Sequence, residues 1–366
     1  MLRGKNFDKL VAAGVTVLTG TAEFVDHHHL KVCLTNGSVQ ELEAEQIFIN
    51  TGARPIVPPI PGLKDSKYAL VSEQLLDQRQ LPKHLAIIGG GYIGVEMASM
   101  YANFGSQVTI IQDGAAFLPR EDEEVAAVVL ESLQKRGIRI ISSAKIEQVE
   151  DAEDTAVLTI ALPQEKIQLQ ADLILVATGR KPNVEDLHLE RTDIALTDRG
   201  AIQTDSYLQT TVPGIYAMGD VVGGLQFTYI SLDDCRIVKS QILGDGSRHL
   251  GNRGEVPYSV FIDPPFSRVG MTEKEATEKG HKVQIFWMPA AAIPKAQVLR
   301  KPEGMLKAVV DEETKELLGA HLFCEESHEL INLMKLVIDA KLPYTVLRDN
   351  IYTHPTMSEA LNDLFA

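Results

Sequence analysis

The chain has 366 residues, 45% of them hydrophobic and 23% charged, which is typical of a globular protein with two or three domains. Thirty-five basic against 50 acidic residues give a formal net charge of −15, which argues against nucleic acid or membrane partners. The N-terminus lacks the apolar core of a signal peptide, and no apolar run reaches about 18 residues, so a cytoplasmic protein is expected.

Residues 1–58 predict part of a domain. A helix is expected at about 3–13, a strand at VTVLTG (15–20), a hairpin around DHHHL (26–30) and an apolar strand at IFIN (47–50). The Asn36-Gly37 pair favours a two-residue hairpin loop. Four prolines within ARPIVPPIPGL (53–63) indicate an extended crossing into the next domain.

Residues 59–183 predict a complete dinucleotide-binding domain. From Leu85 the order is strand, glycine turn, helix, strand, helix and strand: LAIIG, YIGVEMASMYANFG, VTIIQ, EDEEVAAVVLESLQKRG and IRIIS. Two successive βαβ units of this kind form a parallel sheet. Short alternating strands follow to about residue 170, and ADLILVATG (171–179) is another apolar strand. The predicted fold class is therefore α/β, with a Rossmann-like domain.

The remaining sequence predicts two further parts. Residues 184–255 contain few periodic runs apart from YAMGD (216–220) and a helix near SLDDCRIVKSQIL (231–243). From residue 256 to 366 the pattern is that of an α+β domain, with a strand at YSVFI, a helix at TEKEATEKG and a long helix over about 327–341.

The motif GGGYIGVE (89–96) has the spacing G-x-G-x-x-G at Gly89, Gly91 and Gly94, after a strand and at the start of a helix. Gly89 permits the tight turn, Gly91 lets a pyrophosphate approach the helix N-terminus, and Gly94 allows close helix–strand packing. Tyr92 and Ile93, inside the motif, are further candidate cofactor contacts. The alternative is a tight glycine turn that binds no ligand.

The residues that read the ribose are expected about 20 positions further on, where the second strand ends. Gln112 and Asp113 occupy this point. An acid there accepts a hydrogen bond from the ribose 2′-hydroxyl and repels a 2′-phosphate, so NAD is favoured over NADP. Arg120 is the nearest basic residue, and we expect it to belong to the start of the next helix.

Two strand ends share a Thr-Gly turn, IFINTGARP (47–55) and LVATGRKPN (175–183), and suggest two related nucleotide-binding units. Candidate cofactor contacts there are Thr51, Gly52, Gly179 and Arg180. In YAMGDVVGG (216–224), Asp220 follows a glycine and either holds a polyol hydroxyl of a cofactor or lies in a surface turn.

No metal site is predicted. Adjacent residues of a strand point to opposite faces, so of three consecutive histidines only His27 and His29 could converge, and we expect them in solvent at a hairpin tip. The widely separated cysteines fit neither a disulfide framework nor a zinc site, and are expected to be reduced and mostly buried. They are Cys33, Cys235 and Cys324.

Near the C-terminus, THPTMSE (353–359) places a histidine and a glutamate at a spacing that suits an acid–base pair. A carboxylate beside an imidazole orients the ring and stabilises its protonated form. His354 and Glu359 are therefore candidate catalytic residues. The alternative is an ordinary helix start at Pro355.

With GGGYIGVE, ATGRKPN, PGIYAMGD and HPTMSE in this order, the whole chain resembles the class I pyridine nucleotide-disulfide oxidoreductases, flavoenzymes that include dihydrolipoamide dehydrogenase, glutathione reductase and mercuric reductase. VVGGLQFTYISLDD and PYSVFIDPPFSRVG look most similar to the mercuric-reductase-like and reactive-chlorine-resistance branch. The resemblance implies a homodimer with FAD and NAD(P)H as cofactors and a small-molecule electron acceptor.

The resemblance also implies roles for single residues. The glycines of GGGYIGVE and Gly179 would bind NAD(P)H, and His354, held by Glu359, would act as the acid–base group in the partner subunit's site. Residues 256–366 would form the dimerisation domain, and an NAD(P)-binding domain at 59–183 would be inserted between two parts of an FAD-binding domain. The residues implied for FAD are Asp220 at the ribityl chain, Ala22 near the adenine, and Phe227 and Thr228 in the stretch over the flavin.

The chain departs from the family pattern in three respects. No N-terminal G-x-G-x-x-G βαβ unit and no C-x4-C redox pair with its nearby lysine occur in these 366 residues. Glu96, whose family counterpart pairs with that lysine, lacks this partner, and Gln112 replaces the usual glutamate. We therefore expect a sequence that lacks its N-terminus. The alternatives are a redox-inactive NAD(H)-binding and dimerisation module, and an NAD(P)H oxidase that needs no disulfide.

Overall fold

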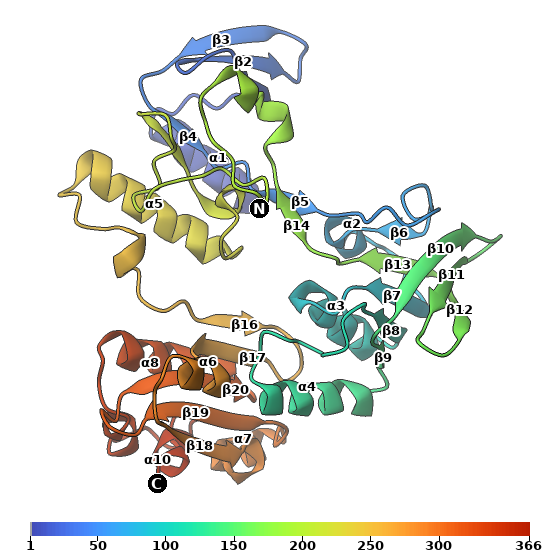
Figure 1. Ribbon diagram of the computed structural model, residues 1–366, viewed down its shortest axis with the longest axis vertical. Coiled ribbons are helices and arrows are strands. Elements are labelled where there is room, and N and C mark those ends of the chain that lie inside the picture. The colour runs from blue at the N-terminus through green and yellow to red at the C-terminus, as the bar shows by residue number, and fades with distance from the viewer. Residues whose placement is uncertain (1) are drawn as a thin grey trace. The chain divides into compact units, whose positions relative to one another are not determined.

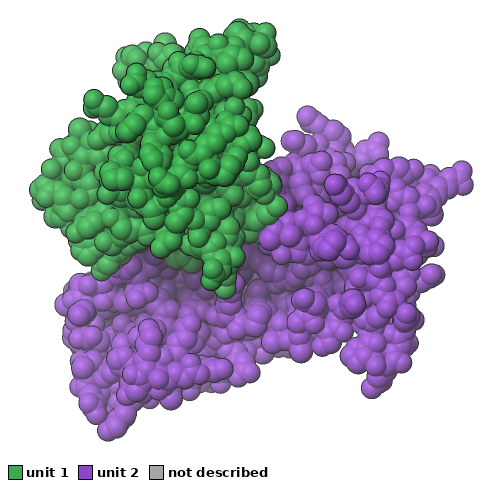
Figure 2. All heavy atoms as spheres, turned by 45° about the horizontal axis from the view of Figure 1, so that its top comes forward, with its two compact units in different colours: residues 1–54, 180–253 green, residues 55–179, 254–366 purple. Residues whose placement is uncertain are grey.

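The computed structural model describes residues 2–366 and divides into two units (Figure 1). Residues up to 54 together with 180–253 form the first unit, and residues 55–179 together with 254–366 form the second, as coloured in Figure 2. Each unit is thus assembled from two separate stretches of sequence. Over residues 2–366, no helix combines the length and the apolar character needed to cross a bilayer.

In the first unit, an antiparallel meander in the order β1-β2-β3 follows helix α1, and a parallel pair joins β4 to β15. Ile47, Ile49 and Ile215 of the parallel pair are buried with Phe24 of the meander and form the core. Strands β5 and β14 form a second short pair. The bounds are α1 Leu2–Ala12, β1 Gly20–Phe24, β2 His29–Leu34, β3 Val39–Glu43, β4 Ile47–Ile49, β5 Ala53–Pro55, β14 Arg180–Pro182, η1 Glu185–Leu187, η2 Leu189–Arg191, β15 Ile215–Ala217, η3 Gly219–Val222, α5 Thr228–Leu243 and η4 Leu250–Asn252.

Two local predictions in this unit are wrong. VTVLTG forms no strand before Gly20, where β1 begins, because within the described chain no strand pairs with residues 15–19. The hairpin loop at Asn36-Gly37 is longer than two residues, because the N–H of Leu34 donates to the carbonyl of Ser38 at 2.9 Å. Gly37 accommodates the turn with a φ of 86°.

The second unit begins with the predicted parallel sheet, in the order β6-β13-β7-β8-β9. Strands β7 and β8 are nearly continuous apolar runs because both faces of the sheet are covered, and Leu85, Ile87 and Ile110 are fully buried. An antiparallel sheet, β10-β11-β12, is attached to it. The bounds are β6 Ala69–Leu70, α2 Ser72–Leu76, β7 His84–Ile88, α3 Tyr92–Asn103, β8 Gln107–Ile111, α4 Glu123–Lys135, β9 Arg139–Ile141, β10 Lys145–Asp151, β11 Ala156–Ala161, β12 Lys166–Ala171 and β13 Leu173–Val176.

The C-terminal part of the second unit is an antiparallel sheet in the order β16-β17-β20-β19-β18, packed against helix α8. Leu330, Ile331 and Met334 of α8 are buried against Leu322 of β20. The predicted α+β pattern is therefore confirmed. The bounds are β16 Tyr258–Val260, β17 Phe266–Gly270, α6 Glu273–Glu278, β18 Val283–Pro289, η5 Ala290–Ala292, α7 Pro294–Leu299, β19 Met305–Asp311, β20 Leu317–Phe323, α8 Ser327–Asp339, α9 Thr345–Arg348 and α10 Ala360–Leu364.

A buried lysine links the two parts of the second unit. The side chain of Lys307, on β19, is 1% exposed, and its Nζ lies 3.0 Å from Asp122, 2.8 Å from Glu124 and 2.8 Å from Glu273. Asp122 and Glu124 lie at the start of α4. The first turn of α4 is thus tied to the C-terminal sheet by a charge cluster, in addition to apolar packing.

Candidate functional site

The glycine-rich turn between β7 and α3 shows which of its glycines the packing requires. Gly89 has a φ of 109°, and a Cβ there would lie 2.4 Å from the carbonyl oxygen of Ala177. A Cβ on Gly94 would lie 2.1 Å from the carbonyl oxygen of Gly89. Gly91 is different, because a Cβ there would meet nothing within 4 Å. Packing therefore explains Gly89 and Gly94, whereas Gly91 borders open space.

That open space lies at the N-terminus of α3, which spans Tyr92–Asn103 with Gly91 as its N-cap. Within residues 2–366, no side chain caps this end of the helix. Its first N–H groups are therefore free of side-chain partners, and together with the helix dipole they favour an anionic ligand such as a pyrophosphate. Ile93, next in the helix, is half-buried.

At the end of β8, Gln112 is buried and Asp113 is exposed. The Nε2 of Gln112 donates to the carbonyls of Gly114 (3.0 Å) and Ala116 (2.9 Å) and lies 3.2 Å from the hydroxyl of Ser142. A Cβ on Gly90 would lie 2.1 Å from its Oε1, so the amide also reaches under the glycine-rich turn. Gln112 therefore braces the loop, and a carboxylate could not donate these hydrogen bonds.

Tyr92 joins the glycine-rich turn to other elements. Its hydroxyl donates to Glu121 Oε1 at 2.5 Å, the hydroxyl of Tyr258 donates to the same oxygen at 2.7 Å, and the two hydroxyls are 3.3 Å apart. Burial and the charge of Glu121 raise the pKa of Tyr92 to about 12. Sequence reasoning did not identify Glu121 and Tyr258 as site residues, because their contact joins residues distant in sequence.

The first Thr-Gly turn lies in the first unit beside β14. Thr51 Oγ1 donates to the carbonyl of Asn183 at 2.7 Å, and the N–H of Asn183 donates to the carbonyl of Gly52 at 2.9 Å. The guanidinium of Arg180 donates to the carbonyl of Ala53. The structure thus brings together Thr51, Gly52 and Arg180, which were predicted from two separate stretches.

The second Thr-Gly turn, at 178–179, lies in the second unit. Thr178 Oγ1 donates to the carbonyl of Ile56 at 2.8 Å, and the N–H of Ile56 donates to the carbonyl of Gly179 at 2.9 Å. Gly179 has a φ of 114°, which favours glycine. The backbone of Ile56, in the proline-rich segment 53–63, therefore fixes this turn.

Asp220 lies in the short helix η3, directly after Gly219, whose φ is 72°. Burial raises the pKa of the Asp220 carboxyl, and the positive charge of Arg180 opposes this shift. The half-buried carboxylate is suited to accept hydroxyl donors. Phe227 and Thr228 form the start of α5, where the rings of Phe227 and Tyr229 stack with centroids 5.2 Å apart. Ala22 is half-buried in β1.

His354 and Glu359 lie in the segment before α10, and the structure places them in contact. Nδ1 of His354 is 2.7 Å from Glu359 Oε2. The His354 side chain is 71% exposed, whereas that of Glu359 is 17% exposed. Met357 and Ala360, both buried in the C-terminal core, anchor the segment. The carboxylate of Glu359, fixed by the buried residues beside it, therefore orients the exposed imidazole of His354.

Glu96, on α3, makes a different contact from the one its family counterpart makes with a lysine. Its Oε1 accepts from the N–H of Phe261 at 2.8 Å, and burial raises the pKa of its carboxyl. Among the described residues, no hydrogen bond joins Glu96 to His354 or Glu359. The structure therefore assembles the acid–base pair without Glu96.

The cysteines correct one expectation, that they are mostly buried. Cys33 and Cys235 are exposed, because they lie on outward-facing positions of β2 and α5, and only Cys324 is buried. Burial raises the pKa of the Cys324 thiol to about 12. The described residues contain no cluster of three metal-ligating side chains.

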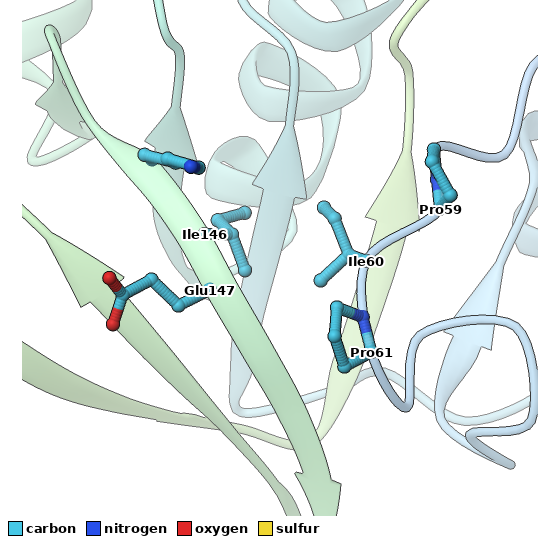
Figure 3. Close-up of a pocket in the computed structure, with 6 residues that line it drawn as sticks. Pro59, Ile60, Pro61, Ile146 and Glu147 are labelled. Atoms are coloured by element: carbon cyan, nitrogen blue, oxygen red, sulfur yellow. The ribbon is translucent and has the colours of Figure 1, made fainter.

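A surface hollow of about 480 Å³ lies elsewhere in the second unit, between the proline-rich segment and β10. The side chains of Ile60 and Ile146 face one another across it, and the carboxylate of Glu147 points away (Figure 3). None of the predicted cofactor residues lines this hollow.

Two family models match the chain. Residues 3–234 match the model described as pyridine nucleotide-disulphide oxidoreductase, and residues 256–365 match the dimerisation domain of the same family. Together the two models leave only short stretches of the chain unmatched.

Curated proteins and solved structures agree with these matches. The chain is 50% identical over 366 residues to a protein of Escherichia coli described as probable pyridine nucleotide-disulfide oxidoreductase RclA, covering all of this chain and 82% of that protein. It is 35% identical to mercuric reductase of Staphylococcus aureus, covering 99% of this chain and 65% of that protein. The structure of the HOCl-induced flavoprotein disulfide reductase RclA from Escherichia coli superposes with a TM-score of 0.94, at 50% identity, covering 100% of this chain and 82% of that one. LpdA from Mycobacterium tuberculosis superposes with a TM-score of 0.89, at 25% identity, covering 99% and 79%.

Proposed function

Because the chain belongs to the pyridine nucleotide-disulphide oxidoreductase family, we propose that it serves a reaction in which electrons pass from NAD(P)H through FAD to a disulfide, a metal ion or another small acceptor. The observation that carries the proposal is the contact of His354 with Glu359, which presents an oriented imidazole on an exposed segment. When bound, the nicotinamide and flavin supply the hydride and electron transfer.

The dinucleotide fits the N-terminus of α3. Gly91 leaves room for the pyrophosphate, and the uncapped N–H groups of the first helical turn would donate to it. The end of β8 would face the adenosine ribose, where the exposed Asp113 would accept from the 2′-hydroxyl. Because this carboxylate would repel a 2′-phosphate, we propose that NADH binds more tightly than NADPH.

The ribityl part of FAD fits the half-buried carboxylate of Asp220, which would accept from its hydroxyls. Phe227 and Thr228 would lie along the flavin from the start of α5, and Ala22 and the turn at 51–52 along the adenine half. These assignments follow the family pattern. Burial raises the pKa of the Asp220 carboxyl, and this supports the assignment because the ribityl hydroxyls would donate hydrogen bonds to the half-buried carboxylate.

In the proposed reaction, His354 moves a proton to and from a thiol, and Glu359 holds its ring. Cys33, Cys235 and Cys324 form no C-x4-C pair, so in this proposal the thiol is that of the reduced acceptor. With Nδ1 directed at Glu359, the other ring nitrogen, Nε2, is the atom that would exchange the proton.

We propose a homodimer in which this imidazole serves the partner subunit. Large apolar side chains on the C-terminal part support a partner surface: Ile351 is 94% exposed close to His354, and Phe261 and Trp287 are 65% and 63% exposed. Light scattering of the wild type and of Ile351→Lys would test this, with a dimer expected for the first and a weaker dimer for the second. The cytoplasmic location expected from the sequence stays a prediction.

The function is tested with the chain incubated with FAD and freed of excess cofactor. We expect flavin absorbance that NADH bleaches under argon, and turnover with an oxidised dithiol, Hg(II) or Cu(II) as acceptor. His354→Gln should retain the bleaching but lose on the order of 10²- to 10⁴-fold in disulfide turnover. His28→Gln, which changes an exposed hairpin histidine, is the matched control and should behave as the wild type.

The second candidate function is a redox-inactive module that binds NAD(H) and dimerises. The scattered cysteines favour it, since Cys33 and Cys235 lie on separate elements and Cys324 is buried. A colourless protein that still binds NADH and sediments as a dimer would support the module and contradict the flavoenzyme.

A further inference from the structure

Tyr92, Glu121, Tyr258 and Arg268 form a buried polar cluster in the second unit. The side chain of Glu121 is 1% exposed and that of Arg268 is 9% exposed, with Arg268 Nη1 3.6 Å from Glu121 Oε2. The same Nη1 donates to the carbonyl of Arg120 at 2.5 Å. The hydroxyls of Tyr92 and Tyr258 both donate to the other oxygen of Glu121.

The cluster joins helix α3, the loop that follows β8 and the C-terminal sheet. Tyr92 is the first residue of α3, at the proposed pyrophosphate cradle, and Glu121 ends the loop that follows β8. Tyr258 and Arg268 belong to β16 and β17 of the C-terminal sheet. Both loops proposed to hold the dinucleotide are therefore attached to one carboxylate, which Tyr258 and Arg268 of the C-terminal sheet also contact.

The position of Tyr92 gives this attachment a consequence for binding. A helix N-terminus binds an anion well only when its N–H groups are already aimed at the ligand, because ordering them on binding reduces the affinity. The hydrogen bond from Tyr92 to a charged, buried acceptor fixes the first turn of α3 from its side chain. Burial also raises the pKa of both phenols, so both remain donors at neutral pH.

We propose that Tyr258 and Glu121 are positioning residues for the dinucleotide: acting through Tyr92, they hold the first turn of α3 in the conformation that binds the pyrophosphate. The inference rests on the proposed dinucleotide site. The C-terminal sheet would then contribute to the affinity for NAD(P)H in addition to its proposed role in dimerisation. Neither residue touches the ligand in this arrangement.

The test compares two Tyr→Phe substitutions in the full chain. Tyr258→Phe removes the hydroxyl but retains the ring, whose centroid lies 5.5 Å from that of Tyr92. Tyr101→Phe is the matched control, because Tyr101 lies on the same helix and its buried hydroxyl donates to the carbonyl of Leu75 at 2.9 Å. The Kd for NADH and the thermal midpoint are measured for both variants.

We expect Tyr258→Phe to raise the Kd for NADH about tenfold, which corresponds to the loss of a hydrogen bond to a charged group. Tyr101→Phe should lower the thermal midpoint and leave the Kd unchanged. In a Tyr92→Phe background, Tyr258→Phe should have no further effect on the Kd, because its route to α3 is already broken.

Three results would overturn the inference in distinguishable ways. If the wild type binds NADH and Tyr258→Phe binds it equally well, the positioning role is wrong and the dinucleotide site stands. If the wild type binds no NADH, the proposed site itself is wrong and the inference falls with it. Equal losses of affinity from Tyr258→Phe in the wild-type and Tyr92→Phe backgrounds would show that Tyr258 does not act through Tyr92.

Discussion

Replacing Lys307 by Met should be among the most destabilising single changes in the second unit. The substitution keeps most of the side-chain volume but removes a cation that is 1% exposed and contacts three carboxylates within 3.0 Å. Glu124 and Glu273 are 69% and 46% exposed and can turn to water. Asp122, 4% exposed, cannot, and is left as a buried charge without its partner.

Removing one partner of a buried ion pair costs about 3–5 kcal/mol of unfolding free energy. An exposed ion pair contributes about 0–1 kcal/mol, so Lys282→Met, which breaks a pair in which both side chains are 71% exposed, is the matched control. Adding Asp122→Asn to Lys307→Met should recover part of the loss, because it removes the unpaired charge.

The pH dependence of stability provides a second measure. Burial alone would raise the pKa of Asp122, but the hydrogen bond from Lys307 holds it below its usual value. A lowered carboxyl pKa stabilises the fold above the unfolded-state pKa of about 3.9, and this contribution is lost as the pH falls through the folded-state pKa. The difference between wild type and Lys307→Met should therefore be largest at neutral pH and shrink in acid.

The assay is urea unfolding followed by the fluorescence of Trp287, the single tryptophan, which pairs with Lys307 across β18 and β19. Far-UV circular dichroism of the same samples checks that the two signals change together. A loss below about 1 kcal/mol for Lys307→Met, equal to that of Lys282→Met, would refute the reasoning, because it would mean that water reaches the cluster.

The remaining predictions concern the glycine-rich turn and the buried acid of α3. Gly89→Ala should raise the Kd for NADH, measured by fluorescence titration, at least about tenfold, because its Cβ would lie 2.4 Å from the carbonyl of Ala177. Gly105→Ala, with a similar φ and nothing within 4 Å, should bind NADH as the wild type does. Glu96→Gln should raise the thermal midpoint at pH 7, and its difference from the wild type should shrink towards pH 4. Burial raises the folded-state pKa of Glu96, so its contribution to stability is full below about pH 4.3 and is lost as the pH rises through that pKa. A thermal midpoint at pH 7 that is lower for Glu96→Gln than for the wild type would contradict this account.

The parts of the fold that the sequence predicted are those whose periodicity reflects burial. Strands β7 and β8 and helices α3 and α4 were predicted because their apolar spacing and glycine turns agree with one another. VTVLTG failed because β-branched residues favour a strand only where another strand satisfies the backbone. Propensity alone could not supply that information.

The charged clusters could not be predicted for a different reason. Lys307 lies in MLKAVVD, a strand that is buried throughout, and a charge in the middle of such a strand was the one signal that it needed partners. The partners, Asp122 and Glu273, are far away in the sequence, and nothing local identifies them. Gln112 was predicted to face the ligand, and only the structure shows that its amide nitrogen is used by the loop.

The clusters around Glu121 and Lys307 have a consequence for recombination between members of the family. Both connect the region matched by the first family model to the region matched by the second. A chimaera that joins the first 255 residues of this chain to the C-terminal domain of a relative would keep Glu121 and Asp122 but take the relative's residues in place of Tyr258 and Lys307. Such a hybrid should be stable only where the relative carries a tyrosine and a lysine at the equivalent strand positions, because otherwise Glu121 and Asp122 are left as buried carboxylates without these partners.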